Sequence, residues 1–451
     1  MSLPRRVDAA RDVAFDALRA VRENDAYANL VLPGLLAARA LNARDAAFAT
    51  ELVYGTLRGL GSYDAVLASV SSRPLAKLDP AVLDVLRLGT HQLLAMRVGA
   101  HAAVDSSVSL ARAKVGHGPA GFVNAVLRKV SARDLAGWLA MVAPDREVDP
   151  IGHLCVVHSH PRWVVEAIRD SLGGDLAETE AMLAADNERP AVTLVARPGR
   201  ADVDELLSLG ARPGRWAPTA AILDSGSPSS LPPVQAGRAG VQDEGSQLVA
   251  LALSSVPIEG RDGRWLDLCA GPGGKAALLG GLAVQRGARL LAIERQPHRA
   301  RLVAGAVGET ADAVIADGTA PAWANGSFDR VLVDVPCSGL GALRRRPEAR
   351  WRRQPSDVNA LRPLQRSLLQ SALDAVRPGG VVAYVTCSPH LAETRDIVDE
   401  VLASRNDVER LDARPQLPGV DLLGDGPDVQ LWTHRHGTDA MFLALLRRSL
   451  A

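Results

Sequence analysis

Two cysteines stand directly after two aliphatic segments that have the composition of buried strands. Cys337 ends the segment "RVLVDVPC" and Cys387 ends the segment "GVVAYVTC", and the chain of 451 residues has only four cysteines. A cysteine thiolate is a strong nucleophile, and neighbouring cations favour its formation. Asp334, three residues before Cys337, adds an acid at the same strand end. These residues predict a site for covalent catalysis by a thiolate.

A pyrimidine ring presents a chemical problem that such a thiolate solves. Carbon 5 of the ring is a poor nucleophile, but addition of a thiolate to carbon 6 makes carbon 5 resemble an enamine. Carbon 5 can then take a methyl group from a sulfonium donor, after which a base removes its proton and the thiol is eliminated. In the common strand order 3-2-1-4-5 the strands before Cys337 and Cys387 are neighbours, so both thiols should reach one crevice.

A glycine-rich turn, "LDLCAGPGGKA" over 266–276, joins another buried strand to a helix. Glycines let the backbone approach a ligand closely, and a helix N-terminus favours polar or anionic groups. The turn does not match a nucleotide-phosphate loop, because Cys269 replaces its first glycine and Ala276 its serine or threonine. Ala276 also breaks the dinucleotide-binding pattern G-x-G-x-x-G.

Three acids end the strand segments that follow this turn, namely Glu294, Asp317 and Asp334. An acid at the end of the second strand commonly holds ribose hydroxyl groups, and successive strand ends face the crevice where doubly wound sheets bind ligands. The turn and the acids together predict a nucleoside ligand without a phosphate chain, such as S-adenosylmethionine.

Changes in the pattern of apolar residues along the chain predict three domains. Residues 1–135 have apolar positions at three- and four-residue spacing, which predicts an all-helical bundle. Residues 145–235 mix helical and strand-like segments and predict a small α+β linker domain, in which the Ser-, Pro- and Gly-rich stretch 224–240 is expected to be a loop. Residues 240–451 alternate short aliphatic strands with helices and close with "AMFLALLRR". They predict a Rossmann-like, doubly wound α/β domain whose parallel sheet is covered on both faces.

Composition limits the class of protein. The net charge is zero, with 51 basic and 51 acidic residues, but local charge rather than the sum decides nucleic-acid binding. The cysteines are widely spaced without a CxxC pair, which argues against a disulfide scaffold. The pattern Cys155-x2-His158-x-His160 lacks a fourth ligand, so we expect no metal site. No segment resembles a signal peptide or a membrane span, and we expect a cytoplasmic monomer without a membrane partner.

The segment 241–450 resembles the RNA cytosine-5 methyltransferases, the bacterial Sun/Fmu group related to the NOP2/NSUN proteins. The resemblance rests on "VQDEGSQ" (241–247), "LDLCAGPGGKA", "DVPCSGLGALRRRPEARW" and "YVTCS". It implies that Cys387 is the nucleophile, that Cys337 helps to release the product, and that Asp334 holds cofactor and target base. The implied cofactor is S-adenosylmethionine, with contacts from Cys269, Ala270, Gly271, Pro272, Gly273, Gly274, Lys275, Glu294, Asp317 and Asp334.

A few positions depart from the family pattern. Glu294 stands where aspartate is more usual, and Gly271 and Ala276 replace a frequent alanine and a frequent threonine or serine. After "TCS" the family often reads Glu-Asn-Glu, of which this chain keeps Glu393. These departures bear on cofactor affinity and on the start of the next helix, and they leave the chemistry unchanged.

Residues 6–131 resemble the all-helical NusB antitermination domain, an RNA binder, through "ARDVAFDALRAV", "ELVYGTLRGL" and "LGTHQLLAM". In the Sun/Fmu group such a domain precedes the methyltransferase, and this order implies a cytosine of 16S ribosomal RNA as the target. The basic residues Arg112, Lys114, Arg128 and Lys129 are candidates for phosphate contact. An ordinary solvated helix face explains these four residues nearly as well.

An arginine-rich run follows the Cys337 motif. Arginine pairs with phosphate and stacks on bases, and an aromatic ring can support a displaced base. Such runs are usually solvated loops, but this position favours RNA contact. The predicted RNA contacts are Arg344, Arg345, Arg346, Arg350, Trp351 and Arg352. The target cytosine must be unstacked, so we expect single-stranded or loop RNA.

Three other functions are weighed against methylation of 16S ribosomal RNA. The same chemistry on tRNA is one, and the helical domain speaks against it. A non-catalytic RNA-binding or antitermination factor is the second, and the presence of both cysteines and all three acids speaks against it. A small-molecule methyltransferase is the third, and it leaves the helical domain and the arginine-rich run without a role.

Overall fold

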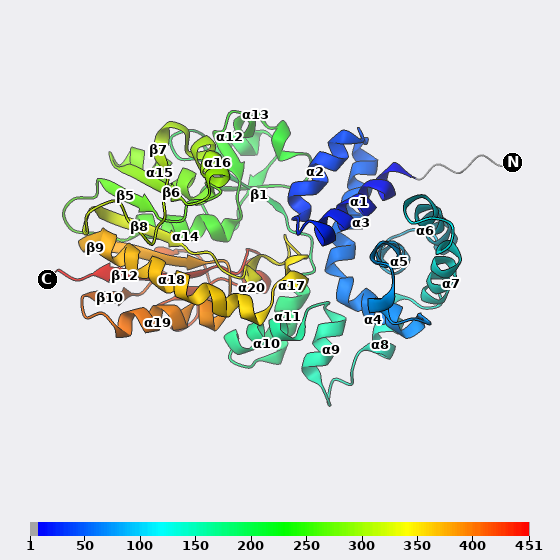
Figure 1. The fold of residues 1–451 in the computed structure, drawn as a ribbon. Coiled ribbons are helices and arrows are strands. Elements are labelled where there is room, and N and C mark those ends of the chain that lie inside the picture. The colour runs from blue at the N-terminus through cyan, green and yellow to red at the C-terminus, as the bar shows by residue number, and fades with distance from the viewer. Residues whose placement is uncertain (1–7, 451) are drawn as a thin grey trace. The chain divides into compact units, whose positions relative to one another are not determined.

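The computed structural model describes residues 8–450, and the chain divides into two compact units (Figure 1). The first, here called the helical unit, consists of Met1–Glu188 and Leu343–Arg352. The second, the sheet unit, consists of Arg189–Ala342 and Arg353–Ala451. In this division the predicted linker segment 145–235 is not a unit of its own. Its part up to Glu188 belongs to the helical unit and the remainder to the sheet unit.

The helical unit is a bundle, as predicted for its first 135 residues. Its helices are α1 (Ala9–Glu23), α2 (Ala28–Ala38), α3 (Ala43–Arg58), α4 (Leu60–Val70), α5 (Pro80–Leu94), α6 (Ala100–Lys114), α7 (Ala120–Val130), α8 (Leu135–Val142), α9 (Pro150–Val157), α10 (Arg162–Ser171), α11 (Leu176–Ala185) and α17 (Ala349–Arg352). Asp8 and Asn42 start α1 and α3 by accepting hydrogen bonds from first-turn N–H groups. In α1, Val13, Ala17 and Val21 recur every four residues and are buried, which gives the helix one apolar face.

The sheet unit contains a small antiparallel sheet with strand order β2-β3-β1-β4. Its strands are β1 (Val192–Ala196), β2 (Arg212–Pro213), β3 (Ala220–Leu223) and β4 (Ala239–Val241), and α12 (Val203–Ser208) and α13 (Pro232–Gln235) accompany them. The expectation of a loop over the whole of 224–240 is therefore wrong. The stretch contains α13 and the start of β4, which pairs with β1. Backbone pairing with β1 satisfies N–H and C=O groups that a loop would leave to water.

The large sheet of this unit has the strand order β10-β12-β9-β8-β5-β6-β7, with β11 paired to β12. Its strands are β5 (Arg264–Asp267), β6 (Arg289–Glu294), β7 (Ala311–Ile315), β8 (Phe328–Asp334), β9 (Val376–Thr386), β10 (Val408–Leu411), β11 (Val429–Gln430) and β12 (Phe442–Arg448). The strands β5 to β9 are parallel, and β12 runs antiparallel to β9. The order β7-β6-β5-β8-β9 confirms the predicted order 3-2-1-4-5, and β12 confirms the predicted closing strand.

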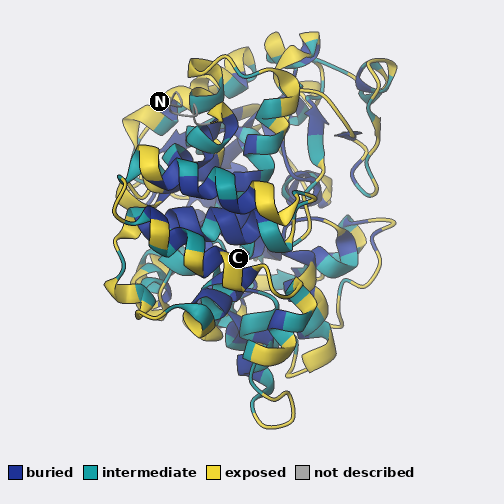
Figure 2. Cartoon of the chain, turned by 90° about the vertical axis from the view of Figure 1, so that its right-hand side faces the viewer, coloured by how far each residue is buried: buried dark blue, intermediate teal, exposed yellow. Residues whose placement is uncertain are grey.

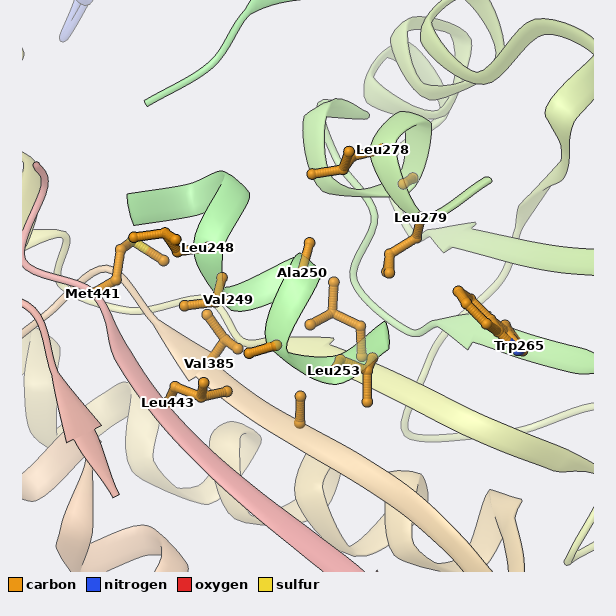
Figure 3. Close-up of a cluster of buried hydrophobic side chains, with 14 of the residues drawn as sticks. Leu248, Val249, Ala250, Leu253, Trp265, Leu278, Leu279, Val385, Met441 and Leu443 are labelled. Carbon is orange, nitrogen blue, oxygen red and sulfur yellow. The ribbon is translucent and has the colours of Figure 1, made fainter. Parts of the chain in front are cut away.

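Two apolar cores cover the two faces of the large sheet. Alternate strand residues point to opposite faces, so Leu332 belongs to one core while Val331 and Val333 belong to the other. The helices are α14 (Glu244–Ser255), α15 (Gly274–Gln285), α16 (Pro297–Val307), α18 (Pro355–Ala375), α19 (Arg395–Ala403) and α20 (Thr433–His436). Residues of α14 and α15 share the first core with the sheet (Figure 3), and residues of α18 and α19 share the second. This arrangement confirms the predicted doubly wound α/β fold.

Figure 2 shows that many helices carry both buried and exposed residues along their length. Across residues 8–450, no helix is both long enough and apolar enough to cross a membrane.

Candidate active site

The loops after β8 and β9 bring Cys337 and Cys387 together. The two strands are parallel neighbours, with Asp334 paired to Val385, so both loops leave the same edge of the sheet. The Sγ atoms of the two cysteines lie 3.5 Å apart, within hydrogen-bond distance for sulfur. A backbone hydrogen bond of 2.9 Å from the N–H of Gly341 to the carbonyl of Cys387 also links the two loops.

The two thiols have opposite tendencies to ionise. A hydrogen bond from Cys337 lowers the pKa of Cys387, and the cation of Lys275 lowers it further, against the effects of burial and of Asp334. The hydrogen bond with Cys387, together with burial, raises the pKa of Cys337 well above its ordinary value. The geometry therefore favours a thiolate at Cys387 and a protonated thiol at Cys337.

Lys275 supplies the positive charge of this site. Its ammonium group lies 2.8 Å from Oδ2 of Asp334. Burial alone lowers the pKa of Lys275, but the charge of Asp334 and the hydrogen bond to it outweigh burial, so the pKa is raised. Lys275 is thus held as a cation that compensates the nearby carboxylate and stabilises a thiolate.

The glycine-rich turn lies between β5 and α15, and its backbone is closely packed at two glycines, of which Gly273 is required by its backbone conformation. Gly273 precedes α15 with a φ of 114°, and a Cβ there would lie 2.7 Å from the Cβ of Ala306. A Cβ at Gly271 would lie 2.0 Å from Oε2 of Glu294. The turn therefore packs closely on α16 and the end of β6, and it leaves the N-terminus of α15 at the carboxyl edge of the sheet.

The three predicted acids lie at the carboxyl ends of β6, β7 and β8. Glu294 is buried, and its Oε1 accepts a hydrogen bond of 2.8 Å from the N–H of Gln296. Asp317 is more exposed and accepts hydrogen bonds from the hydroxyl and the N–H of Thr319, which lower the pKa of Asp317. Asp334 is engaged with Lys275.

Two further polar groups beside the glycine-rich turn were missed by the sequence reasoning. Asp267 ends β5 and is fully buried, and burial together with the charge of Asp334 raises its pKa to about 7. Its Oδ2 and the Oε1 of buried Gln242 have no hydrogen-bond partner among the described residues. Gln242 lies beside Gly274, since its Cδ is 3.6 Å from the position of a Cβ there. The signal for both lay in the motifs "LDLCAG" and "VQDEGSQ", which contain them.

Not all residues of the arginine-rich run occupy the exposed positions that RNA contact requires. Arg350 is fully buried within the helical unit, and burial lowers its pKa to about 10. Its guanidinium donates hydrogen bonds to the carbonyl oxygens of Arg58, Ser159 and Asp186 and to Oδ1 of Asn187, at 2.7 to 3.2 Å. A guanidinium that is occupied and closed off in this way cannot also pair with a phosphate, which argues against Arg350 as an RNA contact.

Other members of the run also have roles in the helical unit. Arg352 donates hydrogen bonds to the carbonyl oxygens of Val21, Asp25 and Ala26. The six-membered ring of Trp351 lies against Gly61, where a Cβ would be 2.5 Å from Cη2. Arg344 is buried and Arg345 is partly buried, and both have interaction partners, whereas Arg346 is exposed, with its guanidinium over the ring of Tyr27. Of the six predicted RNA contacts, Arg346 has the surface position that the prediction needs.

The four candidate cations of the helical bundle also differ in whether they are exposed or paired within the unit. Lys114 forms ion pairs with Asp12 and Asp16 at 2.6 and 2.7 Å, so its charge is compensated within the unit. Arg112, Arg128 and Lys129 are exposed. The last three keep the position expected of phosphate contacts.

The pattern of Cys155, His158 and His160 does not gather into a metal site. In the part of the chain that the structure describes, no group of three metal-ligating side chains is found. Burial lowers the pKa of His158 and of His160, and Nδ1 of His160 lies 2.7 Å from the carbonyl of His158. These histidines are accounted for as neutral residues of the helical unit.

Comparison with known proteins decides the family. Residues 256–447 match the family model described as 16S rRNA methyltransferase RsmB/F, and residues 8–132 match the NusB family. A ribosomal RNA small subunit methyltransferase B from Pseudomonas syringae is 32% identical over 424 residues, covering 90% of this chain and 89% of the relative. The chain belongs to the RsmB/F family of 16S rRNA methyltransferases. It is therefore an S-adenosylmethionine-dependent methyltransferase with an N-terminal NusB-like domain and an RNA substrate.

Further relatives extend over nearly the whole chain. A Mycobacterium tuberculosis protein named as a methyltransferase is 56% identical over 450 residues, covering 99% of this chain and 98% of the relative. Among solved structures, the protein PH0851 superposes with a TM-score of 0.79 at 21% identity, covering 99% of this chain and 100% of that chain. NSun6 from Pyrococcus horikoshii, solved with SFG, has a TM-score of 0.54 at 16% identity and covers 64% of this chain and 99% of its own. The two structures show a shared fold.

Proposed function

We propose that this methyltransferase modifies carbon 5 of a cytosine in 16S ribosomal RNA, with Cys387 as the nucleophile. The observation that carries the proposal is the thiol pair, whose Sγ atoms lie 3.5 Å apart and whose pKa values are shifted in opposite directions. This arrangement divides the work between one thiolate and one protonated thiol, as covalent addition followed by release requires. The relatives named as ribosomal RNA small subunit methyltransferase B support the choice of RNA.

The reaction begins when the Cys387 thiolate adds to carbon 6 of the cytosine and places an electron pair on carbon 5. S-adenosylmethionine would supply the methyl group that carbon 5 takes up, with the electron pair of the broken sulfur–methyl bond staying on the sulfur, which leaves as a neutral thioether. A base then removes the proton from carbon 5, the double bond between carbons 5 and 6 forms again, and the electron pair of the carbon–sulfur bond returns to Cys387. Cys337 donates a hydrogen bond to the departing sulfur, because its raised pKa keeps its proton in place.

The remaining residues of the site are assigned to binding and orienting the target base and the cofactor. Asp334, held by Lys275 at 2.8 Å, is assigned to the target base and to the cofactor. The cofactor contacts are assigned to 269–275, Glu294 and Asp317. The unpartnered oxygen atoms of Asp267 and Gln242 fit the same ligand, because its ammonium group and ribose hydroxyls are hydrogen-bond donors.

RNA binding is assigned to the exposed cations of the helical unit. Arg112, Arg128, Lys129 and Arg346 lie at its surface, and cations in such positions neutralise phosphates. Mutating one of them should weaken binding to RNA of any sequence by a similar factor and reduce its dependence on salt.

Cysteine variants test the mechanism. Cys387→Ala should abolish methyl transfer while S-adenosylmethionine binding, measured by calorimetry, is retained. Cys337→Ala should accumulate a covalent protein–RNA adduct, seen as a slow band on a denaturing gel. Cys155→Ala is the matched control, because Cys155 belongs to the helical unit whereas the thiol pair belongs to the sheet unit. Methyl transfer by Cys387→Ala would exclude this cysteine as the nucleophile.

The target is tested separately from the mechanism. Bisulfite sequencing of ribosomal RNA and tRNA from a strain that lacks the gene should reveal one cytosine of 16S ribosomal RNA that is no longer protected. Loss of 5-methylcytosine from tRNA alone would show that the same reaction takes place on tRNA instead. An unchanged pattern in both RNAs, together with failure of the purified protein to transfer methyl groups, would favour a non-catalytic RNA-binding factor.

A further inference from the structure

A buried carboxylate binds the two loops that carry Cys337 and Cys387. Glu393 ends the short 3-10 helix η5 (Leu391–Glu393), and its side chain is fully buried. Its Oε1 accepts hydrogen bonds from the N–H of Ser338 at 2.7 Å and from Nε2 of Gln365 at 3.1 Å. Its Oε2 accepts hydrogen bonds from the hydroxyls of Ser338 at 2.5 Å and Ser388 at 2.7 Å. One carboxylate therefore receives four hydrogen bonds.

The two serine donors are sequence neighbours of the two cysteines. Ser338 follows Cys337, and Ser388 follows Cys387, so the carboxylate binds the neighbour of each thiol. The two serine hydroxyls also lie 3.1 Å from each other. Because adjacent Cα atoms are 3.8 Å apart in a trans peptide, a shift of either serine moves the neighbouring cysteine with it.

Further hydrogen bonds hold Glu393 in place and connect its network to more residues around Cys337. The Tyr384 hydroxyl in β9 donates to the backbone carbonyl of Glu393 at 2.8 Å, which anchors η5 to this strand. Gln365, buried in α18, donates to the carbonyl of Pro336 at 2.9 Å, immediately before Cys337. Residues on both sides of Cys337 are thus tied to the Glu393 network.

We propose that Glu393 is a positioning residue that sets the separation of the Cys337 and Cys387 thiols by binding the residue after each of them. This inference rests on the proposed function of the pair, because the pair needs a fixed separation only if both thiols act on one base. Glu393 itself lies behind the cysteines, bound to their neighbours. It acts on the reaction through the two loops.

The charge of Glu393 also affects the Cys337 thiol. The pKa of Cys337 is raised first by the hydrogen bond with Cys387 and by burial, and the Glu393 carboxylate adds to this rise. The groups that shift the pKa of Cys387 most are Cys337, burial, Asp334 and Lys275. The position of Glu393 therefore favours a protonated Cys337.

The test uses the thiols themselves as reporters. In wild-type enzyme and in variants, we would oxidise the thiols with diamide and measure the rate at which a Cys337–Cys387 disulfide forms, by mass spectrometry of the linked peptides. Glu393→Ala removes all four acceptor contacts and should slow this rate at least about tenfold, since a displacement of about 1 Å can cost about 100-fold in a reaction between positioned groups. The same variant should lower kcat about 100-fold, with little change in the KM for S-adenosylmethionine.

Two variants control for charge and for surface effects. Glu393→Gln keeps the shape of the side chain, and its amide group can donate to the serine hydroxyls, which can turn to accept. It should therefore restore the disulfide rate towards the wild-type value. Glu400→Ala, in α19, removes an acid whose ion pairs are with Arg362 and Arg366 and not with the residues next to the cysteines, and it should leave disulfide rate and kcat unchanged.

The outcomes separate the two proposals. A Glu393→Ala enzyme that forms the disulfide at the wild-type rate would overturn the positioning role, whatever its activity. Methyl transfer by Cys387→Ala would instead overturn the proposed function and leave the thiol measurement standing. If Glu393→Ala does not fold, Ser388→Ala provides the decision, because it removes one of the four contacts. It should slow disulfide formation by a smaller factor, and an unchanged rate would overturn the inference.

Discussion

Asp267 gives a prediction about stability whose size follows from the structure. Its side chain is fully buried at the end of β5, and burial together with the charge of Asp334 raises its pKa from 3.8 to about 7. At about 1.36 kcal/mol for each pKa unit, this rise corresponds to about 4 kcal/mol of unfolding free energy. Because the side chain is inaccessible to solvent, screening by water does not reduce this figure substantially.

The direction of the effect follows from proton binding. The folded state holds the Asp267 proton more tightly than the unfolded state, so the folded state carries more bound protons between about pH 4 and pH 7. The free energy of unfolding therefore falls as the pH rises through this range, and the cost is fully present above pH 7. Asp267→Asn cannot ionise, so it should escape this loss while its amide oxygen still accepts from the N–H of Cys269.

Urea-induced unfolding of wild type and Asp267→Asn measures the effect, with both proteins studied at pH 5 and at pH 8. The stability of the variant relative to wild type should increase by about 2.5 kcal/mol between the two pH values, since part of the cost is already present at pH 5. Titration of all other groups is common to both proteins and cancels in the difference. A difference that stays constant with pH would show that Asp267 is ionised in the folded protein, and would refute the reasoning.

Three further predictions concern the site and the helical unit. Lys275→Met removes a cation that lowers the pKa of Cys387, so the pH midpoint of Cys387 alkylation by iodoacetamide should rise by about one unit, and an unchanged midpoint would contradict the assigned role of the cation. Arg350→Met should lower the unfolding free energy of the helical unit by about 3 kcal/mol, whereas Arg346→Ala should weaken RNA binding in a filter assay without changing the melting temperature. Gly273→Ala forces a side chain into a φ of 114° and against α16, and should cost about 1–3 kcal/mol of stability and weaken cofactor binding measured by calorimetry.

The sequence predicted the sheet and the thiol pair because both depend on local patterns. Strand segments such as "RVLVD" are short and aliphatic, and residues that follow parallel strands meet at one edge of a sheet whatever the connecting loops do. Once the strand order was expected, the meeting of Cys337 and Cys387 required no knowledge of distant contacts. The 3.5 Å between their sulfur atoms agrees with that simple rule.

The positions of Arg350 and Glu393 depend on contacts that no local pattern contains. The carbonyl acceptors of Arg350 belong to Arg58 and Ser159, which precede it by 292 and 191 residues. A run of arginines has the same composition whether it binds phosphates or backbone carbonyls, so composition alone favoured the wrong partner for Arg350. Glu393 matches a family position, but its four donors come from three separate loops and helices, and only the folded chain brings them together.

The path of the chain gives the arginine-rich run a structural function. After the Cys337 loop the chain leaves the sheet unit at Ala342, contributes Leu343–Arg352 to the helical unit, and returns to the sheet unit at Arg353. The hydrogen bonds from Arg350 to the carbonyls of Ser159 and Asp186 are buried, and buried polar groups without partners destabilise a fold. The helical unit therefore needs this inserted segment to satisfy its own interior. Substitutions at Arg350 that reduce activity would act first on the stability of the helical unit, and loss of RNA binding alone would not identify Arg350 as an RNA contact.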